Sequence, residues 1–312
     1  MLEGFVLNSL PLDCRLEKAP LQLSFAIMMT IKEALAFGRR QLALSSSSAL
    51  DARLLLEYVL QKNHAYLVAH TDKELTTTQE THYLALIGRA ARREPIPYLT
   101  GNAPFYGRDF QVSPAVLIPR PETEHLVEAV LNWAKEMRLT IRPLHIVDVG
   151  TGSGCIAITL ALLLPDAFIE ACDISPAALE IARQNAYIHR VEERIQFHQG
   201  SMLDPVTGEV HLVTANLPYV ADHEWTIVGD GVKLYEPDIA LRGGHDGLNL
   251  IRLLLDQAAK RLAPGGAIYL EIGWQQGAAV QSLAQSHFPS AKVDVLKDLA
   301  GLDRIVEIVH AK

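Results

Sequence analysis

The chain has 312 residues, a formal net charge of −8, and a composition that is 49% hydrophobic and 21% charged. Such a composition is typical of a folded chain and excludes disordered and collagen-like proteins. Because single cores stop growing near this length, we expect one large domain and a smaller one. The excess of acidic residues argues against a nucleic-acid-binding protein, since Lys and Arg supply most of the affinity for phosphates.

The cysteine content and the apolar runs indicate in which cellular compartment the protein is expected. Cys14, Cys155 and Cys172 are too few for a disulfide framework and do not have the spacing of metal ligands. We therefore expect reduced thiols in a cytoplasmic protein, with no bound metal. No membrane span is expected, because no apolar run reaches the length of about 18 residues that a span needs.

Residues 1–28 are interpreted as an N-terminal extension outside the fold. An apolar stretch at 19–31 is preceded by basic residues, as in a weak export signal, but Glu3 and Asp13 make the leading part acidic. No cleavage site of the Ala-x-Ala kind follows. The natural start would then be Met28 or Met29, and Met1 is the alternative.

Residues 29–94 are predicted to form a small helical domain. Apolar residues recur there at helical spacing, as in the stripe that contains Leu50, Leu54 and Leu55, and no polar group suggests chemistry. Pro95 and Pro97 end this region. Residues 95–118 then alternate short β-prone runs with turn residues, which predicts a β-hairpin linker.

Residues 119–312 are predicted to form the larger domain, of the α/β class. Strands are expected at 144–149, 167–172, 194–198, 210–215, 267–272, 291–295 and 304–309, and helices at 123–137, 154–164, 176–188, 248–262 and 276–287. Strands that alternate with helices indicate βαβ units and a parallel sheet covered on both faces. The last two strands have no helix between them and predict an antiparallel hairpin at one edge. We therefore expect a Rossmann-like domain with a seven-stranded, mostly parallel sheet.

A glycine loop follows the first predicted strand of this domain and opens a helix, with the sequence Asp148-Val149-Gly150-Thr151-Gly152-Ser153-Gly154. Its Gly-x-Gly-x-Gly spacing differs from that of dinucleotide binders, and no Gly-Lys-Ser/Thr marks a triphosphate site. Glycines let the backbone approach a ligand closely, and an acid after the next strand, here Asp173, can accept hydrogen bonds from ribose hydroxyls. The two features together predict a ribose-bearing cofactor. The loop, Asp173, the edge pair and the turn at 264–266 resemble S-adenosylmethionine-dependent methyltransferases, and NAD is the alternative on fold alone.

The tetrapeptide Asn216-Leu217-Pro218-Tyr219 follows the fourth predicted strand, on the same edge as the glycine loop. It resembles the Asn-Pro-Pro-Tyr motif of methyltransferases that modify a planar nitrogen, with Leu217 in place of a proline. The Asn216 side-chain carbonyl and the backbone carbonyl of Leu217 can accept the two N–H bonds of such a nitrogen. Pro218 would fix the backbone, and Tyr219 would offer an aromatic face. Asn216, Pro218 and Tyr219 are the catalytic candidates.

At the level of the whole chain, the sequence from about residue 30 onward resembles the peptide chain release factor glutamine N5-methyltransferases, the HemK or PrmC family. The resemblance includes the segments 94–101, 117–124, 235–237, 243–247 and 271–273, besides the two motifs above. It implies methylation of the glutamine in the Gly-Gly-Gln motif of class-1 translation release factors.

The resemblance also implies roles for individual residues. It implies that S-adenosylmethionine contacts residues 150–154, Asp173, Asn216 and, beside Ser201, Met202, and that residues 216–219 hold the glutamine amide. Phe105 and the segment Arg120-Pro121-Glu122 would line the methionine end of the cofactor or the substrate entrance. The helical domain is predicted to dock the release factor, because the Gly-Gly-Gln tripeptide alone offers little area for stable protein–protein recognition.

Two other activities and one binding role are the alternatives. A ribosomal-protein glutamine N5-methyltransferase would use the same chemistry, but the segment Ile118-Pro-Arg-Pro-Glu-Thr-Glu124 favours the release-factor branch. An N6-adenine nucleic-acid methyltransferase would need base flipping and a basic surface, which the net charge of −8 disfavours. A non-enzymatic S-adenosylmethionine binder would not need Asn216. We expect a monomer whose partners are release factors, without direct contact to nucleic acid or membrane.

Overall fold

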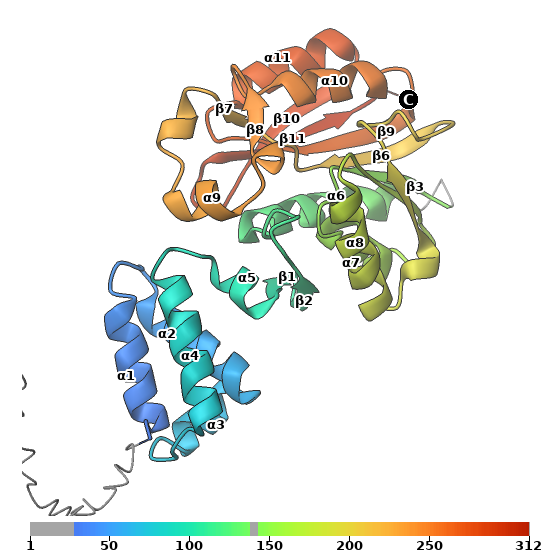
Figure 1. The fold of residues 1–312 in the computed structure, drawn as a ribbon. Helices are drawn as coiled ribbons and strands as arrows, with labels where there is room; N and C mark the ends of the chain where they lie inside the picture. Colours follow the sequence, from blue (N-terminus) through green and yellow to red (C-terminus); the bar gives the residue numbers. More distant parts are fainter. Residues whose placement is uncertain (1–27, 138–142, 312) are drawn as a thin grey trace, which may run out of the picture.

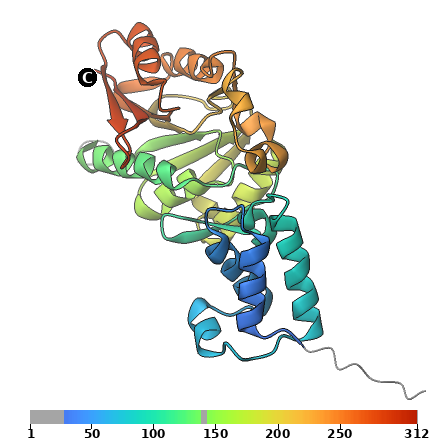
Figure 2. The same ribbon diagram turned by 90° about the vertical axis from the view of Figure 1, so that its left-hand side faces the viewer.

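The computed structural model describes residues 28–137 and 143–311. The expected extension at 1–28 therefore lies outside the described residues except for Met28, and Cys14 lies outside them as well. A body of helices lies beside a larger α/β domain, and a short helix and a β-hairpin connect the two (Figures 1 and 2).

The helical body has a core of its own. It consists of α1 (Ile31–Gln41), α2 (Ser48–Leu60), α3 (His64–Ala69), α4 (Thr77–Ala90) and α5 (Ile96–Thr100). Thr30 and Thr76 form capping boxes at the starts of α1 and α4, with Glu33 and Gln79. Leu99 of α5 is buried in the same core, so the helical core continues past residue 94 and the beginning of the expected hairpin segment is helical.

The hairpin consists of β1 (Asn102–Phe105) and β2 (Arg108–Gln111). Its two-residue turn has positive φ at both Tyr106 (51°) and Gly107 (71°), which matches the right-handed twist of a hairpin. The outer edge of β2 is bonded to side chains of α8 (Pro176–Ile188) and its C-cap. Asn185 accepts from the Gln111 amide at 2.7 Å and donates to the Gln111 carbonyl at 2.9 Å. The His189 ring lies 3.0 Å from the Asp109 carbonyl.

The larger domain is built on a seven-stranded sheet with the order β10-β11-β9-β6-β3-β4-β5. The strands are β3 (His145–Val149), β4 (Phe168–Asp173), β5 (Ile195–Gln199), β6 (Val210–Ala215), β9 (Leu262–Glu271), β10 (Lys292–Lys297) and β11 (Asp303–Val309). β5, β4, β3, β6 and β9 pair in parallel, and β11 is antiparallel to both β9 and β10. The expected mostly parallel sheet with an antiparallel edge pair is confirmed.

Helices cover both faces of this sheet and make it a three-layer domain. On one face pack α6 (Glu124–Met137), α7 (Cys155–Leu163) and α8, and on the other α10 (Asn249–Ala258) and α11 (Gly277–His287). The expected helix at 248–262 ends at Ala258, and β9 begins before the glycines at 265 and 266. The residues between Leu262 and Ala267 form a bulge, because Leu262 pairs with Val210 and Ala267 pairs with Leu212. The short 3-10 helices are η1 (Pro121–Thr123), η2 (Glu192–Arg194), η3 (Glu224–Thr226) and η4 (Asp238–Ala240).

The segment between β6 and α10 holds structure that the sequence patterns did not predict. It contains α9 (Asp230–Tyr235) and two short parallel strands, β7 (Val220–Ala221) and β8 (Arg242–Gly244). α9 contacts the helical body, because the Tyr235 hydroxyl donates to the Arg92 carbonyl at 3.2 Å. A Cβ on Gly231 would lie 2.9 Å from the Arg93 carbonyl oxygen, so a glycine permits this close approach.

Candidate active site

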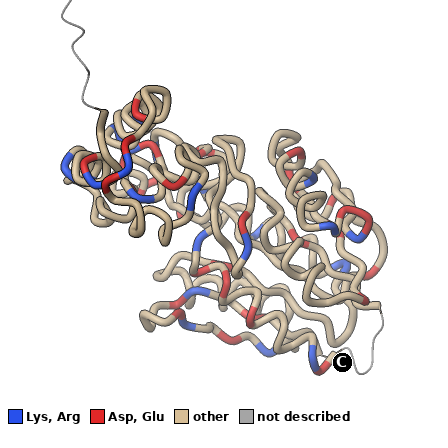
Figure 3. The backbone as a smooth tube through the Cα atoms, turned by 90° about the horizontal axis from the view of Figure 1, so that it is seen from below, with Lys and Arg blue, Asp and Glu red and all other residues tan. Residues whose placement is uncertain are grey.

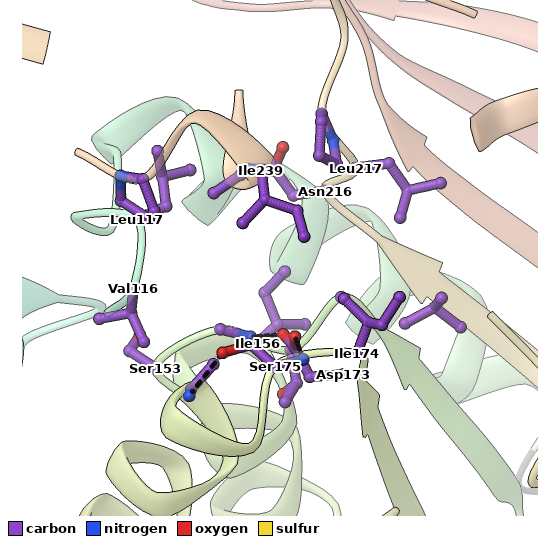
Figure 4. A pocket seen from close by; sticks show the side chains of 18 of the residues that line it. Val116, Leu117, Ser153, Ile156, Asp173, Ile174, Ser175, Asn216, Leu217 and Ile239 are labelled. Carbon is purple, nitrogen blue, oxygen red and sulfur yellow. Dashed lines mark hydrogen bonds between the residues drawn. The ribbon is translucent and has the colours of Figure 1, made fainter. Parts of the chain in front are cut away.

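A cavity of about 350 Å³ lies beyond the carboxyl ends of β3, β4 and β6. This is the edge at which open α/β sheets bind their ligands. Asn216 and Leu217 lie on one side of the cavity and Asp173 and Ser175 on the other, while Val116 and Ile239 approach from the segments before η1 and within η4 (Figure 4).

The glycine loop forms the floor of the cavity. Gly150, Gly152 and Gly154 all have positive φ, at 71°, 55° and 81°, a conformation that favours glycine. The Gly150 and Thr151 amides donate to the Cys172 carbonyl at 2.8 and 3.0 Å, which ties the loop to the end of β4. Gly150, Thr151, Gly152 and Ser153 line the cavity.

Asp173 closes the loop at the end of β4. Its two carboxylate oxygens accept from the Gly152 and Ser175 amides, each at 2.9 Å. Burial raises the pKa of Asp173 above its usual value, against the effect of these amides. Each oxygen keeps a lone pair, so this carboxylate can accept further hydrogen bonds from a ligand hydroxyl.

Asp148 is a site residue to which the sequence reasoning gave no role. It is fully buried below the loop, where it accepts from the Thr151 hydroxyl at 2.7 Å and from the Thr214 hydroxyl at 2.9 Å. Burial raises the pKa of Asp148 to about 6. Asp148 connects the loop to β6 through these two hydrogen bonds. The signal that could have identified it is an acidic residue near the end of an otherwise apolar predicted strand.

Asn216 follows β6 and has a fixed amide. Its Nδ2 donates to Oγ1 of Thr123 at 3.1 Å, and the Thr123 hydroxyl donates to Oε2 of Glu271 at 2.6 Å. Within the part of the chain that the structure describes, neither Oδ1 of Asn216 nor the Leu217 carbonyl accepts a hydrogen bond. Both residues line the cavity, so these two acceptors remain for a ligand.

The other predicted site residues divide into two groups. Pro218 and Met202 also line the cavity, with Met202 beside Ser201, whereas Gly154 and Tyr219 are not part of the lining. Gly154 lies behind the loop, where a Cβ would meet Ile158 and Ala182. The Tyr219 hydroxyl lies 3.5 Å from Oε1 of Glu271, and its expected aromatic face is not part of the lining of this cavity.

The segment that precedes α6 supplies another wall. Arg120 lines the cavity and donates to Oε1 of the buried Glu236 at 2.5 Å, while Oε2 of Glu236 accepts from the Ile118 amide at 3.2 Å. The prediction for Phe105 is wrong, because its side chain is 1% exposed and belongs to the core that includes residues of α6. Pro121 and Glu122 are not part of the cavity lining either.

The described residues contain no candidate metal site and no helix that could span a membrane. Among residues 28–137 and 143–311, no group of three or more His, Cys, Asp or Glu side chains could hold a metal ion. No helix in the same two ranges is long and apolar enough to span a membrane. Cys155 and Cys172 are buried free thiols.

The fold and the cavity define the class of protein: a Rossmann-like methyltransferase. Residues 133–231 match the methyltransferase small domain, and residues 33–101 match the PrmC N-terminal domain. Among solved structures, the catalytic domain of hMettl16 in complex with an RNA hairpin of the MAT2A 3′ untranslated region shares the fold. It has a TM-score of 0.52 at 13% identity and covers 65% of this chain and 77% of that one.

Curated relatives narrow the class to one family. The release factor glutamine methyltransferase of Koribacter versatilis is 41% identical over 89% of this chain and 98% of its own length. That of Neisseria gonorrhoeae is 42% identical over 85% of this chain and 94% of its own length. The chain belongs to the release factor glutamine methyltransferase family.

Proposed function

We propose that this protein transfers the methyl group of S-adenosylmethionine to the side-chain amide nitrogen, N5, of the glutamine in the Gly-Gly-Gln motif of class-1 release factors. The observation that carries the proposal is the direction of the Asn216 amide. Its nitrogen is held by Thr123, which leaves Oδ1 as a free acceptor in the cavity. Family membership supports the choice of a release factor as the substrate.

The residues around the cavity suit S-adenosylmethionine. Asp173 offers carboxylate oxygens to ribose hydroxyls, and the glycine loop leaves the floor free of Cβ atoms at residues 150 and 152. Ile156, Ile174 and Met202 add apolar walls suited to a flat base. When bound, S-adenosylmethionine would supply a methyl group on a sulfonium centre whose sulfur leaves as a neutral thioether, and the methylated amide nitrogen would release one of its two protons to solvent.

The role of this chain is to orient the nucleophile. An amide nitrogen is a weak nucleophile because its lone pair is delocalised into the carbonyl group. Oδ1 of Asn216 and the backbone carbonyl of Leu217 can each accept one N–H bond of the glutamine amide. The lone pair of the nitrogen is perpendicular to the plane of the amide group. Holding both N–H bonds fixes this plane so that the lone pair is directed at the methyl donor, and such positioning supplies most of the catalysis.

The same two acceptors could hold the amino group of adenine, so the substrate class needs a second argument. Along the described parts of the chain, Lys and Arg positions are interspersed with Asp and Glu positions and form no continuous basic run in Figure 3. Affinity for nucleic acid depends on a basic patch or stripe. We therefore propose that the methylated group is the side-chain amide of a protein glutamine rather than the amino group of a nucleic-acid base.

The first test compares substrates directly. We expect transfer of label from S-adenosylmethionine to purified release factors, with none to ribosomal proteins or to DNA. Asn216→Ala should lower kcat by about 100-fold or more, the scale of removing one preorganised hydrogen-bonding group. Calorimetry should give nearly unchanged cofactor affinity for this variant.

Asn132→Ala, on the outer surface of α6, serves as the matched control and should retain full activity. Label on ribosomal protein or on DNA with none on release factor would refute the proposed substrate. Near-normal turnover by Asn216→Ala would refute the amide clamp.

A further inference from the structure

We propose that Thr123 and Glu271 are positioning residues that set the direction of the Asn216 amide, so that its oxygen rather than its nitrogen faces the substrate. This inference deepens the proposed function and rests on it. Thr123 and Glu271 are each 2% exposed, and their contacts form one chain of hydrogen bonds from Glu271 through Thr123 to Asn216.

The proton count along this chain fixes its direction. A carboxylate can only accept, so at 2.6 Å the Thr123 hydroxyl gives its single proton to Glu271. The Thr123 oxygen is then left as an acceptor toward Asn216. The amide must therefore present Nδ2 to Thr123, and Oδ1 takes the side that faces the cavity.

The three residues come from separate parts of the sequence. Thr123 ends η1, Asn216 follows β6, and Glu271 ends β9, the sheet neighbour of β6. Thr123 lines the cavity beside Arg120, whereas Glu271 is not part of the lining, so the two residues give a role in the site to η1 and to the end of β9. η1 carries Thr123 between the two strand ends.

The protonation state of Glu271 decides whether the chain keeps this direction. The groups that interact with its carboxyl are Thr123 and Glu122 from η1, Tyr219 beyond β6, Arg304 from β11 and the buried Cys155 thiol of α7. Burial raises the pKa of Glu271 to about 7, while the Thr123 hydrogen bond and the charge of Arg304 act in the opposite sense. A protonated Glu271 could donate to Thr123, whose hydroxyl would then donate to the Asn216 amide and favour the reversed orientation.

Four proteins test the inference: the wild type, Thr123→Val, Thr123→Ser and Glu271→Gln. Valine has the shape of threonine but no hydroxyl group, so Thr123→Val should lower kcat by about 10- to 100-fold, the scale of misorientation at a reacting group. Thr123→Ser keeps the hydroxyl and should recover most of that loss. Cofactor affinity by calorimetry should change less than about twofold in all three variants.

The pH profile provides a readout that a purely structural role would not change. In the wild type, kcat should rise with pH as Glu271 loses its proton near pH 7. The side-chain amide introduced by Glu271→Gln has no proton to lose in this range, and its carbonyl can accept from Thr123 at every pH. The Glu271→Gln variant should therefore lack this rise.

Three results would overturn the inference: full kcat in Thr123→Val, an equal loss in Thr123→Ser, or an unchanged pH midpoint in Glu271→Gln. Each is read only against a wild type that methylates release factor. A wild type without that activity would refute the proposed function instead, so the two failures are distinguishable.

Discussion

Asp173 makes two backbone hydrogen bonds and still has acceptor capacity toward the cavity. If it binds ribose hydroxyls, Asp173→Ala should weaken S-adenosylmethionine binding by about 1.5–3 kcal/mol, the range for hydrogen bonds to a charged group. Calorimetry measures this directly. Asp204→Ala, at an exposed acid outside the cavity, is the control and should leave the affinity unchanged. Equal affinities for wild type and Asp173→Ala would exclude the carboxylate from the site.

Which residues could be recognised from sequence depended on whether their partners were near in the chain. Gly150, Asp173 and Asn216 stand at strand ends with local motifs, and these motifs predicted their edge of the sheet. Thr123 bonds Asn216 across a sequence separation of 93 residues, and Glu271 bonds Thr123 across one of 148, and only the folded topology reveals these contacts. The direction of the Tyr219 ring likewise depends on Glu271, and no local pattern predicts it.

Leu217 illustrates a residue that the motif alone did not explain. The family motif has proline there, and the backbone carbonyl is present with either residue. In the structure the Leu217 side chain is 3% exposed, and its Cδ2 would lie 3.3 Å from a Cβ on Gly150. The Leu217 side chain therefore packs against the glycine loop and leaves little space for a side chain at position 150.

At the scale of elements, the junction of the glycine loop with α7 depends on Gly154. A Cβ there would lie 2.9 Å from Cδ1 of Ile158 and 3.2 Å from the Ala182 Cβ, at a φ of 81°. Gly154→Ala should cost about 2–5 kcal/mol of unfolding free energy, by adding overpacking to an unfavourable φ. Denaturant unfolding measures this, and cofactor affinity should fall with it.

Gly208 is a matched control for that substitution. It has a φ of 80° with nothing within 4 Å of an added Cβ. Gly208→Ala should therefore show the conformational cost alone, about 1–2 kcal/mol. Equal losses at the two glycines would mean that packing between α7 and α8 does not constrain the loop.

Sequence patterns predicted best those elements whose residues are all buried in the same way along the element. The central parallel strands read as short apolar runs because both of their faces are covered. In α2 the apolar residues extend around the helix, so the predicted stripe was partly wrong: Ala52, Leu55 and Leu56 are buried while Leu50 is 44% exposed. The bulge in β9 and the segment with α9 depend on contacts with distant strands, which local periodicity does not encode.

At the scale of the whole molecule, α9 adds a contact between the helical body and the wall of the cavity, besides the connection through α5 and the hairpin. α9 contacts Arg92 through Tyr235, and the next residue, Glu236, holds Arg120 and the Ile118 amide. These contacts connect a substrate bound to the helical body with the wall of the cavity that contains Asn216. Stable recognition of a protein partner needs about 1,200–2,000 Å² of buried surface, more than a tripeptide can supply.

Deleting residues 1–101, which removes the helical core through Leu99, tests this docking role. We expect cofactor binding to remain measurable and methylation of intact release factor to fall much more than methylation of a short Gly-Gly-Gln peptide. Steady-state kcat/KM for both substrates measures the difference. Equal retention of activity on the two substrates would leave the helical body with a purely structural role.

The contact between α8 and the hairpin also affects how the molecule behaves in a crowded solution. A two-stranded hairpin has an outer strand whose free N–H and C=O groups can pair with a strand of another chain and begin aggregation. Here Asn185 bonds both backbone groups of Gln111, and His189 contacts the carbonyl of Asp109. One helical turn of side chains thus takes the place of a third strand, and this edge of β2 is closed to intermolecular pairing.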